Sequence, residues 1–530
     1  MKKASQDTGK IARSAGTVSI AVMCSRVLGL VREQAFAALF GAGYAYDSFV
    51  VAFRIPNLLR DLFGEGALSS AFVTVFAGYD SQKGEVETWK LANNVLSFFA
   101  VLVSLITLCG IVFAEPLIHL LVDAEFLQVP GKVELTRKLT VIMFPFLVFI
   151  SLSAAVMGML NTKGRFFIPA MASSFFNLGS IIGGVSLALL LPEFGYPAIM
   201  GMAIGTLIGG FLQLAGQLPA LFKVGFTFCP RINLGDPGLK RILYLMVPAV
   251  IGLSATQINI FINTRFASSC IEGSVSWLNY AFRLVQLPIG VFGVAISIAT
   301  LPVISRYAAM KDMGKLKETF ASSLTMAFCL TIPASVGLWL LAEPIIQVIF
   351  QHGAFSSIDT IRTAEALRFY AVGLFAYSSV KIMVPVFFAL NDSRLPVIAS
   401  FLAVGANLVF VNLFIDAFQH EAIAMATSGA MICNFLFLSI VLYKKVQGYS
   451  LSYLGGSLIK ILSASVLMGV WVSFLYGWMR GLFNGGILLQ VAGLVFVIAS
   501  AALLYGIVLY VLKVKELAFV VDRVKGKIGK

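Results

Sequence analysis

The chain has 530 residues, of which 59% are hydrophobic and only 12% are charged. A typical soluble domain carries roughly 25% charged residues, so this composition excludes an ordinary soluble enzyme, a disordered chain and a nucleic-acid-binding domain. Its apolar runs are about twenty residues long, as a helix needs to cross a bilayer, whereas barrel strands alternate over about ten residues. The sequence therefore predicts an all-α polytopic membrane protein.

Fourteen apolar spans are predicted along the chain. In order they cover residues 15–41, 45–77, 90–114, 136–160, 166–191, 197–222, 240–268, 274–306, 318–345, 363–390, 395–416, 421–443, 456–479 and 486–512. The first follows a basic segment but has no clear small-residue cleavage site, so it is interpreted as a retained helix and not as a signal peptide. Cysteines and histidines lack metal-ligand spacing, and no nucleotide or hydrolase motif occurs in a soluble context, so enzyme chemistry is not predicted.

The loop Lys and Arg residues predict the orientation. Most of them fall on the side of the N-terminus and of the basic tail, residues 513–530. The opposite side holds Lys132, Arg137, Lys138, Arg362 and Arg480. The positive-inside rule therefore places both termini in the cytoplasm, and most of the net charge of +14 reflects this bias.

An internal repeat relates the two halves of the chain. "YAFR" at 280–283 matches "VAFR" at 51–54, and "LN" at 390–391 matches "LN" at 160–161. The shared offset of about 230 residues spans six helices, which predicts two parallel six-helix lobes around a central cavity. The predicted lobes are residues 1–222 (helices 1–6) and 223–445 (helices 7–12), and residues 446–530 add two helices and the basic tail.

Eight basic residues lie inside predicted spans. They are Arg26, Arg32, Arg54, Arg60, Arg265, Arg283, Arg368 and Lys381. An arginine at the bilayer centre costs on the order of 2.5–3.5 kcal/mol, so these side chains must snorkel, pair with acids or face a watered cavity. Pairing is an open alternative for Arg32 beside Glu33 and for Arg60 beside Asp61. Because acids are fewer, we predict an electropositive cavity whose guanidinium groups fit a phosphate or pyrophosphate.

Corresponding proline and glycine residues interrupt one predicted helix in each half. They are Pro56, Gly64 and Gly66 in the first half and Pro288, Gly290 and Gly293 in the second. Paired interruptions of this kind predict the binding and hinge region of a transporter, although an ordinary membrane-helix kink is the alternative. Asp392, Asn263 and Thr264 are candidates for a cation site, with interhelical hydrogen bonding as the alternative.

Four segments resemble the MurJ (MviN) family, the lipid II flippases of bacterial cell-wall synthesis. They are "SRVLGLVRE" at 25–33, "FGAGYAYDSFVVAFRIPNLLRDLFGEGALSSAF" at 40–72, "LNTKGRFFIP" at 160–169 and "GSVSWLNYAFRL" at 273–284. The resemblance covers essentially the whole chain. It implies the multidrug/oligosaccharidyl-lipid/polysaccharide exporter fold, with two lobes and two extra helices that form a groove for a lipid tail.

The resemblance also implies a function and a site. Members move undecaprenyl-pyrophosphate-linked disaccharide-pentapeptide from the cytoplasmic to the periplasmic leaflet of the bacterial inner membrane. We expect this chain to do so by alternating access of its two lobes. The substrate-binding residues that it implies are Arg26, Arg32, Asp47, Arg54, Arg60 and Arg283. The chain departs from the family at Phe282 and Gln286, where acids often flank the arginine. It also departs at Phe388, where the sodium site of some members has a polar ligand.

We therefore expect a transporter and not an enzyme, with lipid II and membrane lipid as ligands and no nucleic acid. No cofactor is expected; the coupling is to the membrane potential or a monovalent cation, and other cell-wall synthesis proteins are candidate partners. The alternative is an exporter of another polyprenyl-pyrophosphate glycan, such as an O-antigen unit. A drug/cation antiporter would need an acidic cavity, and a membrane glycosyltransferase would need a larger non-cytoplasmic loop.

Overall fold

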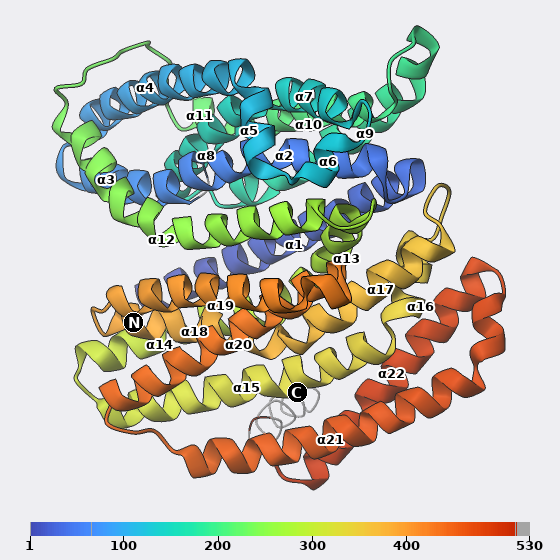
Figure 1. The fold of residues 1–530 in the computed structure, drawn as a ribbon. Coiled ribbons are helices and arrows are strands. Elements are labelled where there is room, and N and C mark those ends of the chain that lie inside the picture. Colours follow the sequence, from blue (N-terminus) through green and yellow to red (C-terminus); the bar gives the residue numbers. More distant parts are fainter. Residues whose placement is uncertain (1, 65, 515, 517–530) are drawn as a thin grey trace. The chain divides into compact units, whose positions relative to one another are not determined.

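The computed structural model describes residues 2–64, 66–514 and 516; for residues 2–17, 19, 482 and 484 it describes the backbone alone. The described chain is helical, as predicted (Figure 1). It forms two compact units, Met1–Ser276 and Trp277–Lys530. Most of the predicted basic tail lies outside the described residues.

The first unit is a bundle of twelve helices within the described residues. They are α1 (Lys2–Phe40), α2 (Tyr44–Phe63), α3 (Ala67–Gln82), α4 (Glu85–Val112), α5 (Ala114–Leu121), α6 (Ala124–Gln128), α7 (Lys132–Met143), α8 (Phe146–Thr162), α9 (Phe167–Leu190), α10 (Ile199–Ala215), α11 (Leu218–Lys223) and α12 (Pro237–Ser268). Helix α1 packs on α9, α2 on α7 and α12 on α3. Fully buried aromatic rings, among them Phe72, Phe76 and Phe146, fill the core.

The second unit contains the remaining helices, of which α13 begins at the end of the first unit. They are α13 (Ser274–Pro288), α14 (Ala295–Ala309), α15 (Met313–Leu340), α16 (Ala342–Phe350), α17 (Ser357–Val372), α18 (Leu374–Ala389), α19 (Arg394–Phe418), α20 (His420–Lys445), α21 (Leu451–Trp478) and α22 (Ile487–Val511). One hydrophobic core joins α15 and α18 to α21 and α22, for example through Phe320, Phe387, Ile461 and Val497. The two C-terminal helices are therefore packed on this unit.

The number of predicted spans is only partly reproduced. By length and apolar composition, eleven helices of the described chain can cross a membrane, or twelve if the bent pair α17–α18 is one span. The two other predicted spans correspond to α1 and to α2 with α3. Helix α2 fails this test because it carries Asp47, Arg54, Arg60 and Asp61 within twenty residues. The exact count of fourteen is not confirmed.

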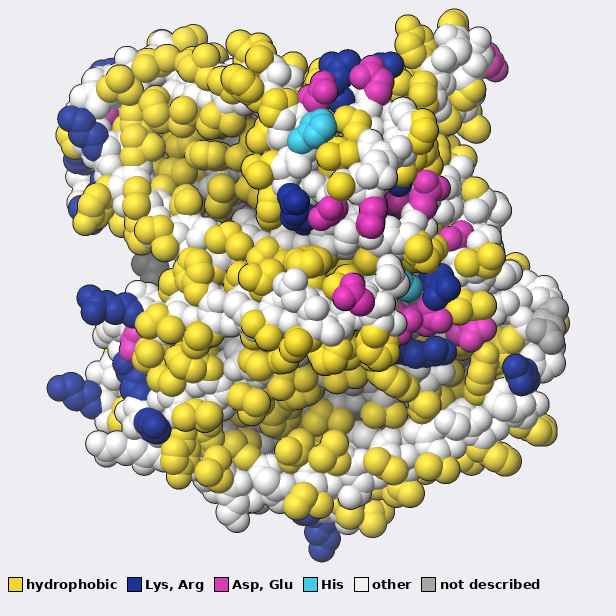
Figure 2. Space-filling view, viewed as in Figure 1, with side chains coloured by type: hydrophobic (Ala, Val, Ile, Leu, Met, Phe, Trp, Pro, Cys, Tyr) yellow, Lys and Arg dark blue, Asp and Glu magenta, His cyan; other side chains and the backbone are white. Residues whose placement is uncertain are grey.

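The outer surface agrees with a membrane protein of many spans. Figure 2 shows hydrophobic side chains over most of the visible face of each unit, interrupted by clusters of charged residues. Large apolar side chains such as Leu488 and Ile182 are 80% and 65% exposed. A soluble monomer rarely leaves extended apolar surface uncovered, so these faces are suited to lipid.

The predicted interruption of the second span is a break between two helices. Helix α2 contains the buried Pro56 and ends where the Gly64 N–H donates to the Arg60 carbonyl at 2.7 Å. A Cβ atom on Gly66, before α3, would lie 2.2 Å from the Asp61 carbonyl oxygen. A side chain at Gly66 would therefore force the two helices apart.

The corresponding region of the second unit is also irregular. Helix α13 ends at Pro288, and the next turn, Ile289–Val294, is a π-helix that contains Gly290 and Gly293. A Cβ atom on Gly293 would lie 2.9 Å from the Cα atom of Ser378. π-Helical turns often occur at functional sites, so the structure has an irregular segment at both predicted positions, and the hinge role remains a prediction.

The first unit extends beyond the predicted lobe boundary at residue 222. The linker between α11 and α12 is held by two buried asparagines of α4. Asn93 and Asn94 form hydrogen bonds with the backbone of Thr227, Cys229 and Asn233 in this linker. Helix α12 then adds its buried Leu239 and Ile242 to the core of this unit. The predicted lobe boundaries at 222 and 445 come from the internal sequence repeat, and they stay predictions.

Helices α9 and α10 approach each other through glycines. A Cβ atom on Gly205 would lie 2.4 Å from the Cα of Gly184 and 2.9 Å from the Ser180 carbonyl oxygen. Close approach of this kind stabilises membrane helix pairs through van der Waals contact.

We expect Gly205→Ala to separate α9 from α10 and to cost about 1–3 kcal/mol, as other overpacked cores do. The measurement is the thermal unfolding midpoint of the detergent-solubilised protein. The control is Gly78→Ala in α3, where a Cβ atom would meet nothing within 4 Å. Alanine is favoured over glycine in a helix, so the control keeps or raises the midpoint. Equal midpoints for both variants would contradict the expected clash.

Candidate functional site

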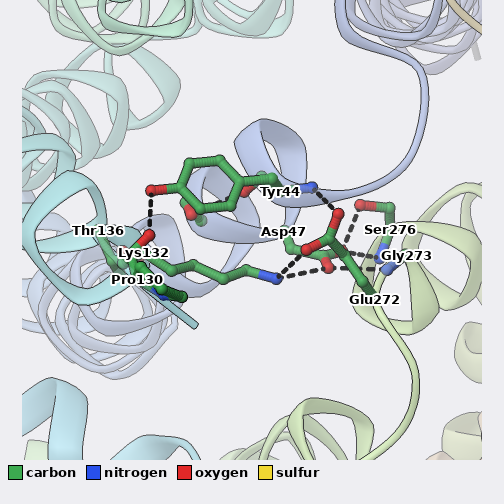
Figure 3. Close-up of polar contacts among 9 residues, drawn as sticks. Tyr44, Asp47, Pro130, Lys132, Thr136, Glu272, Gly273 and Ser276 are labelled. Carbon is green, nitrogen blue, oxygen red and sulfur yellow. Dashed lines mark hydrogen bonds and ion pairs between the residues drawn. The ribbon is translucent and has the colours of Figure 1, made fainter. Parts of the chain in front are cut away.

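The carboxylate of Asp47, on the first turn of α2, accepts four hydrogen bonds. Its Oδ1 accepts the backbone N–H of Ser276 at 3.0 Å and the Ser276 hydroxyl at 2.6 Å. Its Oδ2 accepts the backbone N–H of Gly273 at 2.9 Å and a hydrogen bond from Lys132 Nζ at 3.2 Å (Figure 3). Asp47 is 2% exposed, so these four donors replace its water shell.

Asp47 caps the N-terminus of α13 from another helix. The residue before α13 is Gly273, which has φ +96° and no side chain with which to accept the N–H groups of the first turn. An N-cap side chain normally performs this role, and a carboxylate there also interacts favourably with the helix dipole. Helix α2 therefore holds the start of α13, the helix that leads into the second unit.

Lys132 and Glu272 complete this group. Lys132, the first residue of α7, lies 3.7 Å from Glu272 Oε2 as well as next to Asp47. Glu272 Oε1 accepts the backbone N–H of Tyr44 at 3.2 Å, and the Tyr44 hydroxyl donates to the Pro130 carbonyl at 3.2 Å (Figure 3). We call Tyr44, Asp47, Lys132, Glu272 and Ser276 the Asp47 cluster.

The sequence did not single out the partners of Asp47. Lys132 was predicted only as a loop cation, and Glu272 and Ser276 were not site candidates. A short-range signal existed for one element alone: "GSVS" at 273–276 precedes an apolar run, which is typical of a helix start. The pairing of Lys132 with Asp47 joins residues 85 positions apart and has no local signal.

Two predicted arginines pair with their sequence neighbours. Arg32 Nη2 donates to Glu33 Oε1 at 2.8 Å, and Tyr46 donates to the other oxygen of Glu33 at 2.9 Å. The Arg32 guanidinium also lies over the Phe176 ring, 5.2 Å from its centroid. Arg60 is paired with Asp61 at 3.0 Å. The pairing that the sequence left open is thus present at both positions.

The three other predicted site arginines, Arg26, Arg54 and Arg283, are half-buried. Arg26 and Arg54 lie on α1 and α2 of the first unit. Arg283 lies on α13 in the second unit, seven residues after Ser276, which is about two helical turns. The prediction that these arginines converge on one cavity concerns both units and remains a prediction.

The candidate cation ligand Asp392 is already bonded. It accepts a hydrogen bond from Lys445 and from the backbone N–H groups of Arg394 and Leu395, which begin α19. The Lys445 ammonium, helped by these N–H groups, holds the pKa of Asp392 below its usual value. Its stabilising contribution is therefore present at neutral pH and is lost as the pH falls through this lowered pKa.

Three potential metal ligands, Glu365, His420 and Glu421, lie within 4.8 Å of one another in the second unit. Two of the three, Glu365 and His420, already contact protein groups. Arg362 pairs with Glu365 at 3.3 Å, and the His420 Nε2 atom lies 3.0 Å from the Arg362 carbonyl oxygen. This arrangement is a hydrogen-bonded ion-pair group, and a nearby guanidinium disfavours a cation.

Known proteins resemble most of the chain. A sequence profile described as "Lipid II flippase MurJ" matches residues 36–513. A "Probable lipid II flippase MurJ" of Buchnera aphidicola subsp. Acyrthosiphon pisum is 36% identical over 429 residues, which cover 81% of this chain and 83% of the relative. The chain belongs to the MurJ family.

Further relatives support the MurJ assignment. The "Lipid II flippase MurJ" of Burkholderia cenocepacia is 35% identical over 437 residues, with 81% of this chain and 83% of the relative covered. A solved structure named "Lipid II flippase MurJ, inward closed conformation" has a TM-score of 0.76 and 29% identity, covering 93% of this chain and 99% of that one. An inward-facing multidrug resistance MATE transporter has a TM-score of 0.69 at 15% identity, with coverage of 82% and 99%, and supports the shared fold alone.

Membership in the MurJ family confirms a transporter architecture and agrees with the expectation that the protein is not an enzyme. The matched range includes Asp47, Arg54, Arg60 and Arg283. Arg26 and Arg32 precede it.

Proposed function

We propose that this protein is a lipid II flippase of the bacterial inner membrane, with both termini in the cytoplasm. The observation that carries the proposal is the match to relatives named lipid II flippase over more than four fifths of the chain. The half-buried arginines support it, since guanidinium groups bind the oxygens of a diphosphate in pairs. In this role they hold the pyrophosphate while the polyprenyl tail stays in lipid beside α21 and α22.

Alternating access supplies the mechanism that we propose. Substrate binds on the cytoplasmic side, and the two units then rearrange so that the head group reaches the other side. Release of the Asp47 carboxylate from the N-terminus of α13 frees the start of the second unit to move. The end of α2 at Gly64 and the π-helical turn Ile289–Val294 take up the change of backbone angle. Binding drives this change only to the extent that the substrate prefers one state.

The experiment that tests the function is depletion of the protein in its bacterial host. We expect lipid II to accumulate in the cytoplasmic leaflet and growth to stop by lysis. Accumulation of another polyprenyl-linked glycan with normal lipid II would support the exporter alternative instead. Purified protein in vesicles should also move labelled lipid II, and a preparation that moves none would contradict the proposal.

For the energy source we propose the membrane potential, because Lys445 already supplies the positive charge at Asp392. An anionic head group that moves outward across a membrane with a negative interior is driven by about 2.3 kcal/mol per elementary charge and 100 mV. We expect collapse of the potential to slow lipid II translocation in vesicles severalfold, and exchange of sodium for potassium at constant potential to leave the rate unchanged. A rate that follows sodium would contradict this proposal.

We also propose that other cell-wall synthesis proteins receive the translocated lipid. A flipped precursor must be consumed by a glycan polymerase on the far side of the membrane. Co-purification of the solubilised protein with such an enzyme would test this partner.

A further inference from the structure

We propose that Lys132 is the positioning residue of Asp47: its ammonium holds the carboxylates of Asp47 and Glu272 together at the N-terminus of α13 (Figure 3). The proposal deepens the flippase function above and rests on it. It assigns a role in transport to a residue that the sequence predicted only as a loop cation.

The first argument is the burial of the ammonium. The Lys132 side chain is 3% exposed, and its Nζ lies 3.2 Å from Asp47 and 3.7 Å from Glu272. The rings of Phe126 and Tyr44 flank it at 4.7 Å and 5.8 Å from their centroids. A buried ammonium is tolerated only when it is paired, so its position requires these carboxylates.

The second argument is the charge balance. Two carboxylates, Asp47 and Glu272, approach one cation and one helix N-terminus. Without Lys132 the two negative charges would repel each other in a poorly hydrated place. Glu272 is half exposed and can turn into water, and it would then release the Tyr44 N–H that it accepts. Lys132 therefore keeps the α12–α13 turn attached to the start of α2.

The third argument is that the same chain segment holds the other side of this turn. Just before α6, the backbone N–H of Asp123 donates to the Ser268 hydroxyl at 2.8 Å, and Arg265 donates to the Leu120 carbonyl at 3.2 Å. Residues 120–132 thus contact the end of α12 and, through Lys132 and Glu272, the turn that precedes α13. All these contacts lie within the first unit, so Lys132 is one end of a clamp on the turn 269–273.

The turn contains a natural reporter, Cys270. Burial, with a smaller effect of Glu125, raises the pKa of its thiol to about 12. The thiol is partly buried and donates to the Phe266 carbonyl at 3.3 Å. We therefore expect it to react more slowly while the turn is clamped than when the turn opens to water. The predicted orientation places Cys270 on the outer side, within reach of a membrane-impermeant maleimide added to cells.

The experiment compares the rate of maleimide labelling of Cys270 in the full-length protein. We expect Lys132→Met to raise the labelling rate about tenfold or more. Removal of the ammonium leaves the buried Asp47 carboxylate without its cation, which destabilises the closed turn. Lys132→Met combined with Glu272→Gln should return the rate to within about threefold of the wild type, because the repulsion is gone. Lys132→Arg keeps the cation and should behave like the wild type.

Two controls define the signal. Cys270→Ser identifies the labelled site, and Lys138→Met removes an exposed lysine of the same helix and should leave the rate unchanged. An unchanged rate in Lys132→Met, or no rescue by Glu272→Gln, would overturn the proposal. If the Lys132→Met protein is degraded in the cell, Lys132→Arg becomes the test variant. A labelling rate of Cys270 in Lys132→Arg as high as that in denatured protein would then overturn the proposal. Because labelling needs no substrate, it separates this proposal from a failure of lipid II transport.

Discussion

Asp47→Ala is expected to abolish growth in a strain that depends on this protein. The substitution leaves the Lys132 ammonium buried beside Glu272 alone, and it removes the acceptor of two backbone N–H groups and one hydroxyl. Loss of one partner of a buried ion pair costs about 3–5 kcal/mol. Asp47→Asn is expected to be nearly as harmful, since an amide cannot accept four donors and would place its NH₂ group against one of them.

The measurement is complementation after depletion, with the amount of membrane-inserted protein followed by immunoblot. Asp416→Asn is the matched control, because Asp416 is an exposed acid of α19. Growth supported by Asp47→Ala at normal protein levels would show that the cap on α13 is not needed for transport.

Arg26→Ala and Arg283→Ala are expected to reduce lipid II translocation by roughly 10- to 100-fold each. A charge-assisted hydrogen bond contributes about 1.5–3 kcal/mol, and a guanidinium can make two to a diphosphate. Lysine at either position should restore only part of the rate, because an ammonium lacks the planar fork. The rate is measured with labelled lipid II in vesicles.

Arg32 needs a different design because its removal would leave the 4% exposed Glu33 without its cation. The double variant Arg32→Ala with Glu33→Gln avoids this buried charge and isolates the contribution to substrate binding. Arg165→Ala, at an exposed loop position, is the control for all arginine variants. Full translocation in Arg26→Ala and Arg283→Ala would rule out an arginine-based diphosphate site.

The sequence predicts the fold class well, since long apolar runs have one stable form in a bilayer. The end of α2 before Gly64 and the π-helical turn Ile289–Val294 also lie where the sequence predicts an interruption, because proline and glycine act locally on the backbone, whereas Pro56 lies inside the continuous helix α2. The number of spans was less certain. Helices α1 and α2 carry several charged residues. Sequence hydropathy alone does not identify such a helix as a membrane span, because its charges are compensated by neighbouring helices that the sequence does not reveal.

The site was predicted from its charges and not from its contacts. Arg32 and Arg60 were identified as cations that need partners, and their acidic neighbours in sequence were named as the alternative. The Asp47 cluster could not be derived in the same way. It joins the starts of α2 and α7 to the α12–α13 turn, and no periodicity connects residues 47, 132 and 272.

The packing of α12 on the first unit has a consequence for biogenesis. The core of this unit needs Leu239 and Ile242, and α4 binds the backbone of the linker that precedes them. A nascent chain that has released only its first 222 residues therefore exposes unfilled core surface and unbonded asparagine side chains on α4. We therefore expect a chain truncated at 222 to be degraded faster than one that ends at 276, because only the longer chain carries the linker and the α12 side chains that fill these positions.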